Sequence, residues 1–127
     1  GQAAEPLQAL VPANISVTAC IEEVVLRHGQ RTFFVGADGE PVGLVSLHEL
    51  KQVPVERRPT TAVADIMVPL ADLVRLRHDE TLWRAFELMS EANVNQLPVE
   101  RDGRIVGLLT RERLLGIIQS LRELDRK

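Results

Sequence analysis

Two hydroxyl side chains, Ser46 and Thr110, stand where a short apolar run ends and a helical pattern begins. Such a hydroxyl, together with free backbone N–H groups, can hold a phosphate because the dipole of a helix is positive at its start. Ser and Thr also cap helices there for structural reasons alone, and the two interpretations are compatible. Three residues further on the same helical face are Glu49 and Arg113. The Arg113 guanidinium could clamp a phosphate or remain a solvated surface group.

The histidines and the single cysteine give no catalytic pattern. His48-Glu49 begins like the His-Glu-x-x-His helix of zinc peptidases, but Gln52 stands where the second imidazole is needed. His28 and His78 have no Ser, Cys or carboxylate partner at a spacing that suggests nucleophilic catalysis. Cys20 alone cannot form an internal disulfide or a cysteine zinc cage, which indicates either a reducing compartment or simply no need for crosslinks. We therefore predict no catalytic residues, no metal ligands and no enzyme activity in this chain.

Composition restricts the remaining classes of protein. The chain has 127 residues, of which 45% are hydrophobic and only 3% aromatic, which favours α/β packing of aliphatic side chains. With 15 Lys and Arg against 18 Asp and Glu, the net charge of −3 argues against binding to nucleic acid. No apolar run approaches the roughly 18 residues that cross a bilayer, so we expect no membrane insertion and a cytoplasmic location. The chain begins Gly-Gln-Ala without Met, which is compatible with a piece of a longer protein.

An internal repeat organises the chain. The run Val35–Ser46 is matched by the later run Val99–Thr110, with Asp-Gly, Val-Gly and the final hydroxyl in register. The Asp-Gly pairs predict two tight β-hairpins, since they tolerate the positive φ values of such turns. Each repeat is expected to read strand, helix, strand, strand, helix.

Helical patterns flank each predicted hairpin. Upstream, apolar residues follow Ser16 and Thr81 at helical spacing, and the offset between these two copies is one position longer than the offset between the hairpins. We place the extra residue in the stretch 27–32, where Gly29 marks a helix stop. Downstream, residues 47–52 predict a short helix and residues 114–121 a longer one.

A polar stretch with two prolines, residues 54–61, is expected to link the repeats. It sets a boundary between repeat 1 with its linker, residues 1–59, and repeat 2, residues 60–127. A short helix over residues 63–67, capped by Thr61, should lead into repeat 2. Each half is too small to bury much surface alone, so we expect the two repeats to share one core.

The repeat resembles a tandem pair of cystathionine β-synthase (CBS) domains. The motifs that carry the resemblance are Asp-Gly-x-x-Val-Gly followed by two apolar residues and Ser or Thr, the Ala-Asp-Ile-Met of residues 64–67, and Asn95–Val99. It covers nearly the whole chain and implies two β-α-β-β-α repeats. Such pairs typically form regulatory modules that bind adenine nucleotides or related ligands in clefts between paired repeats. AMP, ADP, ATP and S-adenosylmethionine are the regulatory ligands that it suggests, and no cofactor is required.

The resemblance also implies site residues. CBS nucleotide sites usually place an Asp three residues beyond the hydroxyl, where it accepts hydrogen bonds from the ribose diol. Glu49 keeps this carboxylate with one more methylene, whereas Arg113 has no acceptor and cannot play that role. An apolar floor for adenine is implied, although plain core packing is the alternative for each of its members, which are Val11, Phe33, Phe34, Leu76, Leu97 and Pro98. Trp83 would indicate an interface if it lies off the core stripe of its helix.

Two functions follow as hypotheses. The first is a ligand-sensing regulatory module that modulates an attached catalytic or transport domain. The second is a ligand-independent dimerisation module of a larger protein. The resemblance favours a homodimer of four repeats in either case. The stretches 46–54, 60–63 and 93–99 are also similar to CBS pairs appended to site-2-protease-like intramembrane zinc peptidases. The chain would then be the cytosolic tail of a membrane metallopeptidase.

Overall fold

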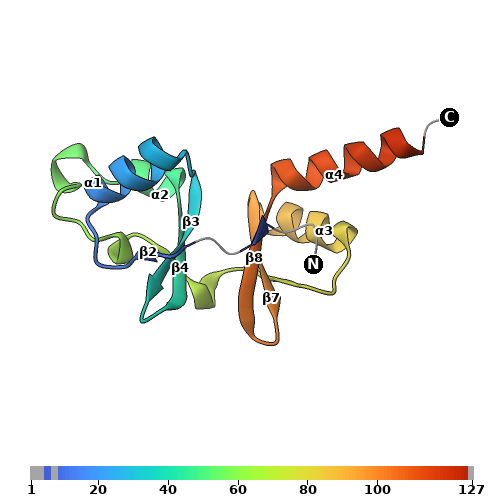
Figure 1. Ribbon diagram of the computed structural model, residues 1–127, viewed down its shortest axis with the longest axis horizontal. Coiled ribbons are helices and arrows are strands. Elements are labelled where there is room, and N and C mark those ends of the chain that lie inside the picture. Colours follow the sequence, from blue (N-terminus) through green and yellow to red (C-terminus); the bar gives the residue numbers. More distant parts are fainter. Residues whose placement is uncertain (1–4, 7–8, 126–127) are drawn as a thin grey trace. The chain divides into compact units, whose positions relative to one another are not determined.

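The chain divides into two compact units. The computed structural model describes residues 5–6 and 9–125; of these, residues 9–72 form the first unit, and residues 73–125 with Glu5–Pro6 form the second. Each unit contains a four-stranded sheet and helices (Figure 1). The boundary drawn from the sequence lay between residues 59 and 60, whereas residues 60–72 are part of the first unit, where β5 (Val68–Pro69) pairs with β4 (Glu40–Ser46).

The first unit follows the predicted order of elements. Its sheet has the order β2-β3-β4-β5, with β2 parallel to β3 and the other neighbours antiparallel. The first half of this unit contains β2 (Val11–Pro12), α1 (Val17–Cys20), a π-helical continuation (Ile21–Leu26) and β3 (Thr32–Ala37). It is followed by β4, α2 (Leu47–Lys51), two short 3-10 turns (Val55–Arg57 and Val63–Asp65), β5 and a third 3-10 turn (Leu70–Asp72). The first repeat is therefore strand, helix, strand, strand, helix, as predicted.

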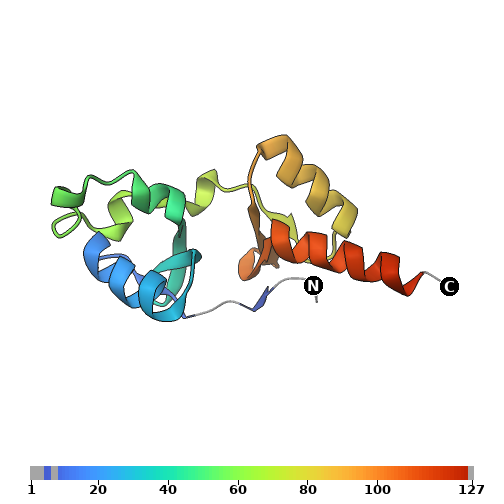
Figure 2. The ribbon, with the colours of Figure 1, turned by 90° about the horizontal axis from the view of Figure 1, so that it is seen from above.

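The second unit has the same topology. Its sheet has the order β1-β8-β7-β6, with β6 parallel to β7 and the other neighbours antiparallel. The elements are β1 (Glu5–Pro6), β6 (Leu76–Arg77), α3 (Leu82–Ala92), β7 (Gln96–Arg101), β8 (Arg104–Thr110) and α4 (Arg111–Leu124). In Figure 2 the helices α3 and α4 lie on the same side of their own sheet. The prediction of an α/β tandem fold is confirmed.

The two hairpins occupy the predicted equivalent positions of the repeats. Strands β3 and β4 begin and end at residues that the repeat aligns with the first and last residues of β7 and β8. Both turns have positive φ at Asp and Gly, with 54° and 78° at Asp38 and Gly39 and 52° and 79° at Asp102 and Gly103. Asp-Gly is one of the few dipeptides that suit this turn, since both central residues adopt left-handed conformations. The hairpin prediction is confirmed.

The extra residue of the first repeat lies inside its helix, not in the stretch 27–32. The helix starts, Ser16 and Thr81, keep the longer offset, but the left-handed residues that end the two helices, Gly29 and Asn93, already have the offset of the hairpins. The π-helical turns over Ile21–Leu26 absorb the insertion, and the N–H of Arg27 bonds the carbonyl of Glu22, five residues earlier. A π-bulge takes up one extra residue without ending a helix. Gly29 is the predicted stop.

The stretch between the repeats packs onto α1. The N–H groups of Val17 and Thr18, at the start of that helix, donate to the carbonyls of Thr61 and Arg58 at 2.8 and 3.2 Å. The predicted cap by Thr61 is wrong, because its hydroxyl donates to the Arg57 carbonyl at 2.8 Å and the following 3-10 turn begins after Ala62. The carbonyls of Thr61 and Arg58 thus satisfy backbone N–H groups at the start of α1 that would otherwise need a side chain or water.

Buried apolar side chains form one cluster in each unit, in place of the single shared core that the sequence suggested. The first cluster includes Val17, Cys20 and Leu50, and the second includes Met89, Leu97 and Leu114. In each unit the helices cover one face of their own sheet. The apolar side chains of each repeat are therefore buried within its own unit. Burial raises the pKa of the Cys20 thiol to about 11. It therefore stays protonated at neutral pH and is a packing residue.

Candidate functional site

The hydroxyl and the carboxylate predicted in the first repeat lie together at the start of α2. Ser46 ends β4 and is the N-cap of α2, and Glu49 occupies the third helical position. One carboxylate oxygen of Glu49, Oε1, accepts from the Ser46 backbone N–H at 2.7 Å and from the Ser46 hydroxyl at 2.8 Å. Ser46 and Glu49 form a capping box, which is the structural interpretation of this pair. The same carboxylate holds the donors that an anion would use.

The corresponding pair of the second repeat has a different arrangement. Thr110 ends β8 and is the N-cap of α4, and its hydroxyl oxygen accepts from the Arg113 backbone N–H at 3.2 Å. Arg113 is exposed. The first turn of α4 carries two arginines, Arg111 and Arg113, and one carboxylate, Glu112. The start of α4 therefore has a surplus of positive charge, whereas the start of α2 holds a carboxylate.

Arg111, which the sequence analysis did not single out, is the residue with the least satisfied side chain in the described part of the chain. Its Nε is buried without a hydrogen-bond partner there, while its Nη2 donates to the Val94 carbonyl at a long 3.4 Å. The equivalent residue of the first repeat is Leu47, which packs against the core of the first unit. Comparing the two repeats position by position would have revealed this Leu-to-Arg difference.

We expect Arg111→Leu to raise the free energy of unfolding by about 1 kcal/mol. The change removes a buried unsatisfied donor and a positive charge at the positive end of a helix, and it restores the side chain of the first repeat. Urea unfolding followed by circular dichroism measures the effect. Arg104→Leu, at an exposed position of β8, serves as the control and should change stability by less than about 0.5 kcal/mol. A destabilised Arg111→Leu variant would mean that the contact of Nη2 with the Val94 carbonyl outweighs the cost of the buried, unpartnered Nε.

The residues predicted to form an apolar floor divide between two environments. Val11 and Phe33 belong to the hydrophobic cluster of the first unit, and Leu76 and Leu97 to that of the second. Phe34 and Pro98 are also buried but lie outside these clusters. They occupy equivalent positions of the two repeats, on the strand faces that point away from the helices. Of the six residues predicted to form the apolar floor, only Phe34 and Pro98 lie outside the two hydrophobic clusters.

A groove of about 380 Å³ lies in the first unit beside Glu49. Its floor includes the buried Val53, and its rim carries Arg57 and Thr61 from the stretch between the repeats. The complete lining is Glu49, Gln52, Val53, Pro54, Arg57, Thr61 and Ile66. Glu49 is the only predicted site residue in this lining, so the groove does not gather the others. This groove was not predicted, because the polar, proline-containing stretch that lines it was interpreted as a linker.

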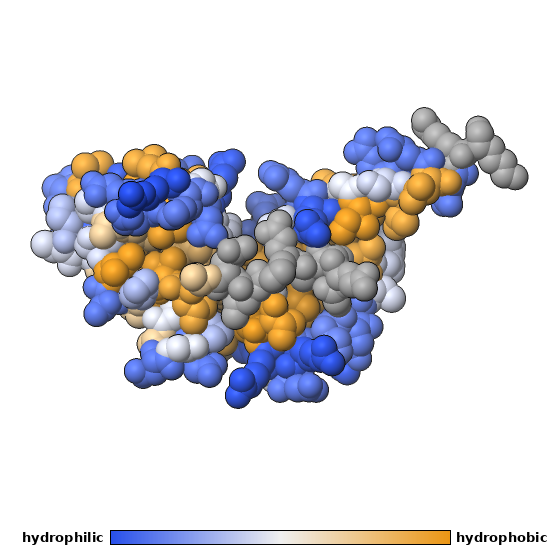
Figure 3. Space-filling view, viewed as in Figure 1, coloured by the Kyte–Doolittle hydropathy of each residue, from blue (hydrophilic) through white to orange (hydrophobic). Residues whose placement is uncertain are grey.

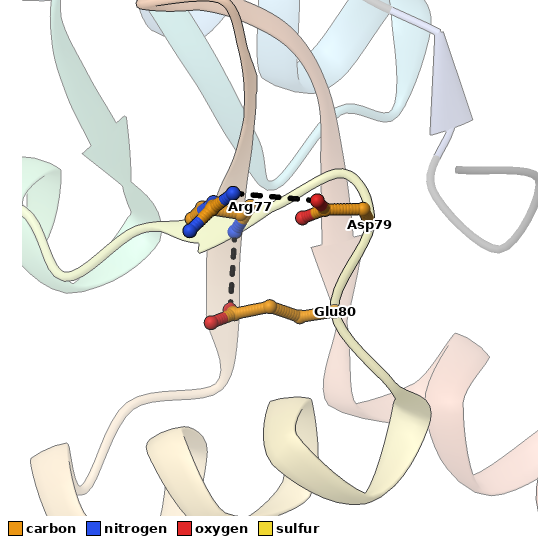
Figure 4. Close-up of polar contacts among 3 residues, drawn as sticks. All are labelled: Arg77, Asp79 and Glu80. Atoms are coloured by element: carbon orange, nitrogen blue, oxygen red, sulfur yellow. Dashed lines mark hydrogen bonds and ion pairs between the residues drawn. The ribbon is translucent and has the colours of Figure 1, made fainter.

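The turn between β6 and α3 contains a group of charged side chains in contact. Arg77 donates from Nη2 to Asp79 Oδ2 at 3.3 Å and from its backbone N–H to Glu80 Oε2 at 3.2 Å (Figure 4). Arg77 also lines a hollow of about 240 Å³ with His78, Glu100, Asp102 and Gly103. Among the described residues, no group of three or more His, Cys, Asp or Glu side chains is placed to hold a metal ion.

Known proteins share this architecture. Residues 63–120 match the model of the CBS domain family. CBSX2 of Arabidopsis thaliana, solved in complex with AMP, superposes with a TM-score of 0.77 at 24% identity and covers 95% of this chain and 96% of its own. The cytosolic domain of the Mg²⁺ channel MgtE, solved with ATP, gives a TM-score of 0.70 at 26% identity and covers 90% of this chain and 46% of its own.

Among curated relatives, Rip3 of Mycobacterium tuberculosis, named as a zinc metalloprotease, is 33% identical over 101 residues. The alignment covers 78% of this chain and only 26% of Rip3, so the chain spans about a quarter of that relative. The family match covers the second repeat, and the structural matches cover both. Residues 63–120 therefore match the CBS domain family, and the chain as a whole has the fold of a tandem CBS pair.

Proposed function

We propose that this chain is a regulatory module that binds an adenine nucleotide or a related adenosyl ligand and modulates an attached domain. The observation that carries the proposal is the Ser46–Glu49 pair at the junction of β4 and α2, in a fold whose relatives include complexes with AMP and with ATP. Binding would turn the Glu49 carboxylate toward the ribose diol and release the Ser46 donors to a phosphate. Phe34 and Pro98 are each buried outside the core cluster of their own unit.

Thermal unfolding with separately added ligands tests this function. AMP, ADP, ATP and S-adenosylmethionine are each added to the chain, and the midpoint Tm is followed by circular dichroism. A ligand that binds only the folded state at a hundredfold excess over its Kd contributes about 2.7 kcal/mol and raises Tm by several degrees. Guanosine monophosphate serves as the control for unspecific phosphate binding. An unchanged Tm with all four ligands contradicts the proposal.

The second candidate is a dimerisation module that needs no ligand. Exposed apolar side chains of the second unit favour it: Trp83 is 69% exposed and stacks on Phe86 with ring centroids 5.9 Å apart. Leu121 and Leu124, near the end of α4, are 51% and 80% exposed, and apolar surface follows this helix (Figure 3). Trp83 therefore lies off the core stripe of α3, which is the condition under which the sequence indicated an interface.

We expect the chain to sediment as a homodimer at micromolar concentration. Trp83→Ser and Leu121→Ser, which remove exposed apolar area, should weaken the dimer. Leu26→Ser is the matched control, because Leu26 is 73% exposed in the other unit. Analytical ultracentrifugation over a range of concentrations measures the association. A strictly monomeric wild type, with or without AMP, contradicts this prediction.

The similarity to Rip3 supports a zinc metallopeptidase of the membrane as the parent protein. Within such a protein the module would be a cytosolic part that carries no catalytic residue of its own. None of the helices in the described residues is long and apolar enough to cross a membrane. Fusing the module to a candidate peptidase domain and assaying proteolysis with and without AMP would test whether ligand occupancy controls the attached domain.

A further inference from the structure

The fourth strand of each sheet is supplied by the segment that precedes the other repeat. Strand β5, which leads into the second repeat, pairs with β4 of the first unit, Val68 opposite Leu44. Strand β1, which leads into the first repeat, pairs with β8 of the second unit, Glu5 opposite Leu108. Since Leu44 and Leu108 are equivalent residues of the two hairpins, the two additions use the same register. Each leading segment is therefore part of the sheet of the opposite repeat.

The pairing of β1 with β8 is short and lies at the edge of its sheet (Figure 1). It joins two residues on each side, Glu5 with Leu108 and Pro6 with Gly107. Proline donates no backbone hydrogen bond, so Glu5 carries the only backbone N–H of β1. A two-residue edge strand is the kind of element that opens locally while the remaining structure stays folded.

Thr110, the candidate anion-binding hydroxyl of the second repeat, lies close to this pairing along the same strand. It stands two residues beyond Leu108, at the end of β8, and it accepts from the Arg113 N–H at the start of α4. Its extended conformation, with φ −97° and ψ 155°, continues the strand into the cap. Pairing with β1 therefore restrains the strand that positions this cap. The first repeat has the same arrangement: Ser46, the N-cap of α2, stands two residues beyond Leu44, which pairs with Val68 of β5.

We propose that β1 is a strap whose pairing with β8 is coupled to the cap at Thr110, so that any chain before Glu5 is linked to the ligand state of the second repeat. A closed strap holds Thr110 in place for an anionic ligand. A bound ligand in turn favours the closed strap, since coupling between two sites is reciprocal. The ligand half of this coupling rests on the proposed nucleotide binding, whereas the strap–cap half does not.

Amide hydrogen exchange, measured by NMR on the whole chain, tests the strap without any ligand. Glu5→Pro removes the only backbone donor of β1, and removal of residues 1–7 eliminates the strand. Both changes should accelerate exchange of the Arg113 amide about fivefold or more, with the amides of α1 unchanged. Ala9→Pro, outside β1, is the matched control. Unchanged exchange at Arg113 in both variants overturns the proposal.

Titration with inorganic pyrophosphate then tests the ligand coupling, because the Thr110 position is expected to take a phosphate-rich group. If the wild type binds pyrophosphate and Glu5→Pro weakens that binding about fivefold or more, the ligand coupling holds. If both bind pyrophosphate equally, or the wild type does not bind it, the ligand coupling is wrong, while the proposed nucleotide binding at Ser46 and Glu49 stands. If the wild type binds neither AMP, ADP, ATP nor S-adenosylmethionine, the nucleotide function is wrong. The ligand half of the coupling then fails as well, and the exchange data alone decide the strap–cap half.

Discussion

Gly43→Ala should destabilise the first unit by about 1–3 kcal/mol. Gly43 lies in the part of β4 that pairs with β5, opposite Pro69. A Cβ added there would lie 2.5 Å from Met67 Sδ and 2.8 Å from the Val68 carbonyl oxygen. The thioether can move, but the carbonyl belongs to the backbone of the paired segment. We therefore expect β5 to be displaced from the sheet, with a lower urea midpoint.

Replacing Gly116 by alanine should change the free energy of unfolding in the opposite direction. Gly116 lies within α4 and is exposed, and beyond its neighbours and the backbone of its own helix nothing lies within 4 Å of the position of an added Cβ. Alanine in an open helical position is favoured over glycine by about 0.5–1 kcal/mol, so Gly116→Ala should raise stability. Urea unfolding of both variants measures the two effects. A neutral or stabilised Gly43→Ala variant would contradict the close approach of β5.

Patterns whose structure depends on a few adjacent residues were predictable from the sequence. The hairpin turns follow from Asp38-Gly39 and Asp102-Gly103, because few other dipeptides adopt two positive φ values in succession. The helix starts at Ser16 and Thr81 follow from their hydroxyls, which accept from Ala19 and Arg84 N–H groups. In each case the interaction that decides the structure spans three residues or fewer.

Features that depend on partners distant in the sequence were not predicted. Nothing local in Glu5–Pro6 indicates that it pairs with β8, which lies near the other end of the chain. The one indication in the sequence is its similarity to Val68–Pro69, which is also a dipeptide ending in proline and pairs with β4. The π-helical turns over Ile21–Leu26 keep the apolar spacing of an ordinary helix, so the extra residue could not be located by periodicity. The engagement of Glu49 by Ser46 was foreseeable as a capping box, since a Glu three residues after Ser is its signature.

The two candidate anion sites should differ in their preference for adenosine, because their third helical residues differ in charge. Glu49 can accept from a ribose diol, whereas Arg113 has no acceptor. We expect an adenosyl ligand to bind first at Ser46 and Glu49, and the Thr110 position to stay empty or to take a phosphate-rich group. Release of Glu49 from its contacts of 2.7 and 2.8 Å with Ser46 must accompany ribose binding, which lowers the affinity of the first position.

Glu49→Ala should reduce the affinity for AMP about tenfold to a hundredfold. A hydrogen-bonded charged group contributes on the order of 1.5–3 kcal/mol, which corresponds to that factor in Kd. Isothermal titration measures the affinity, and circular dichroism confirms folding, since loss of the Ser46 contact costs about 1 kcal/mol of stability. Glu49→Asp, which keeps a carboxylate, should retain binding, and Glu56→Ala, an exposed carboxylate outside the site, should leave it unchanged. Arg113→Asp should add a second site by supplying the missing acceptor. Equal binding by the wild type and Glu49→Ala would show that ribose is not held at this carboxylate.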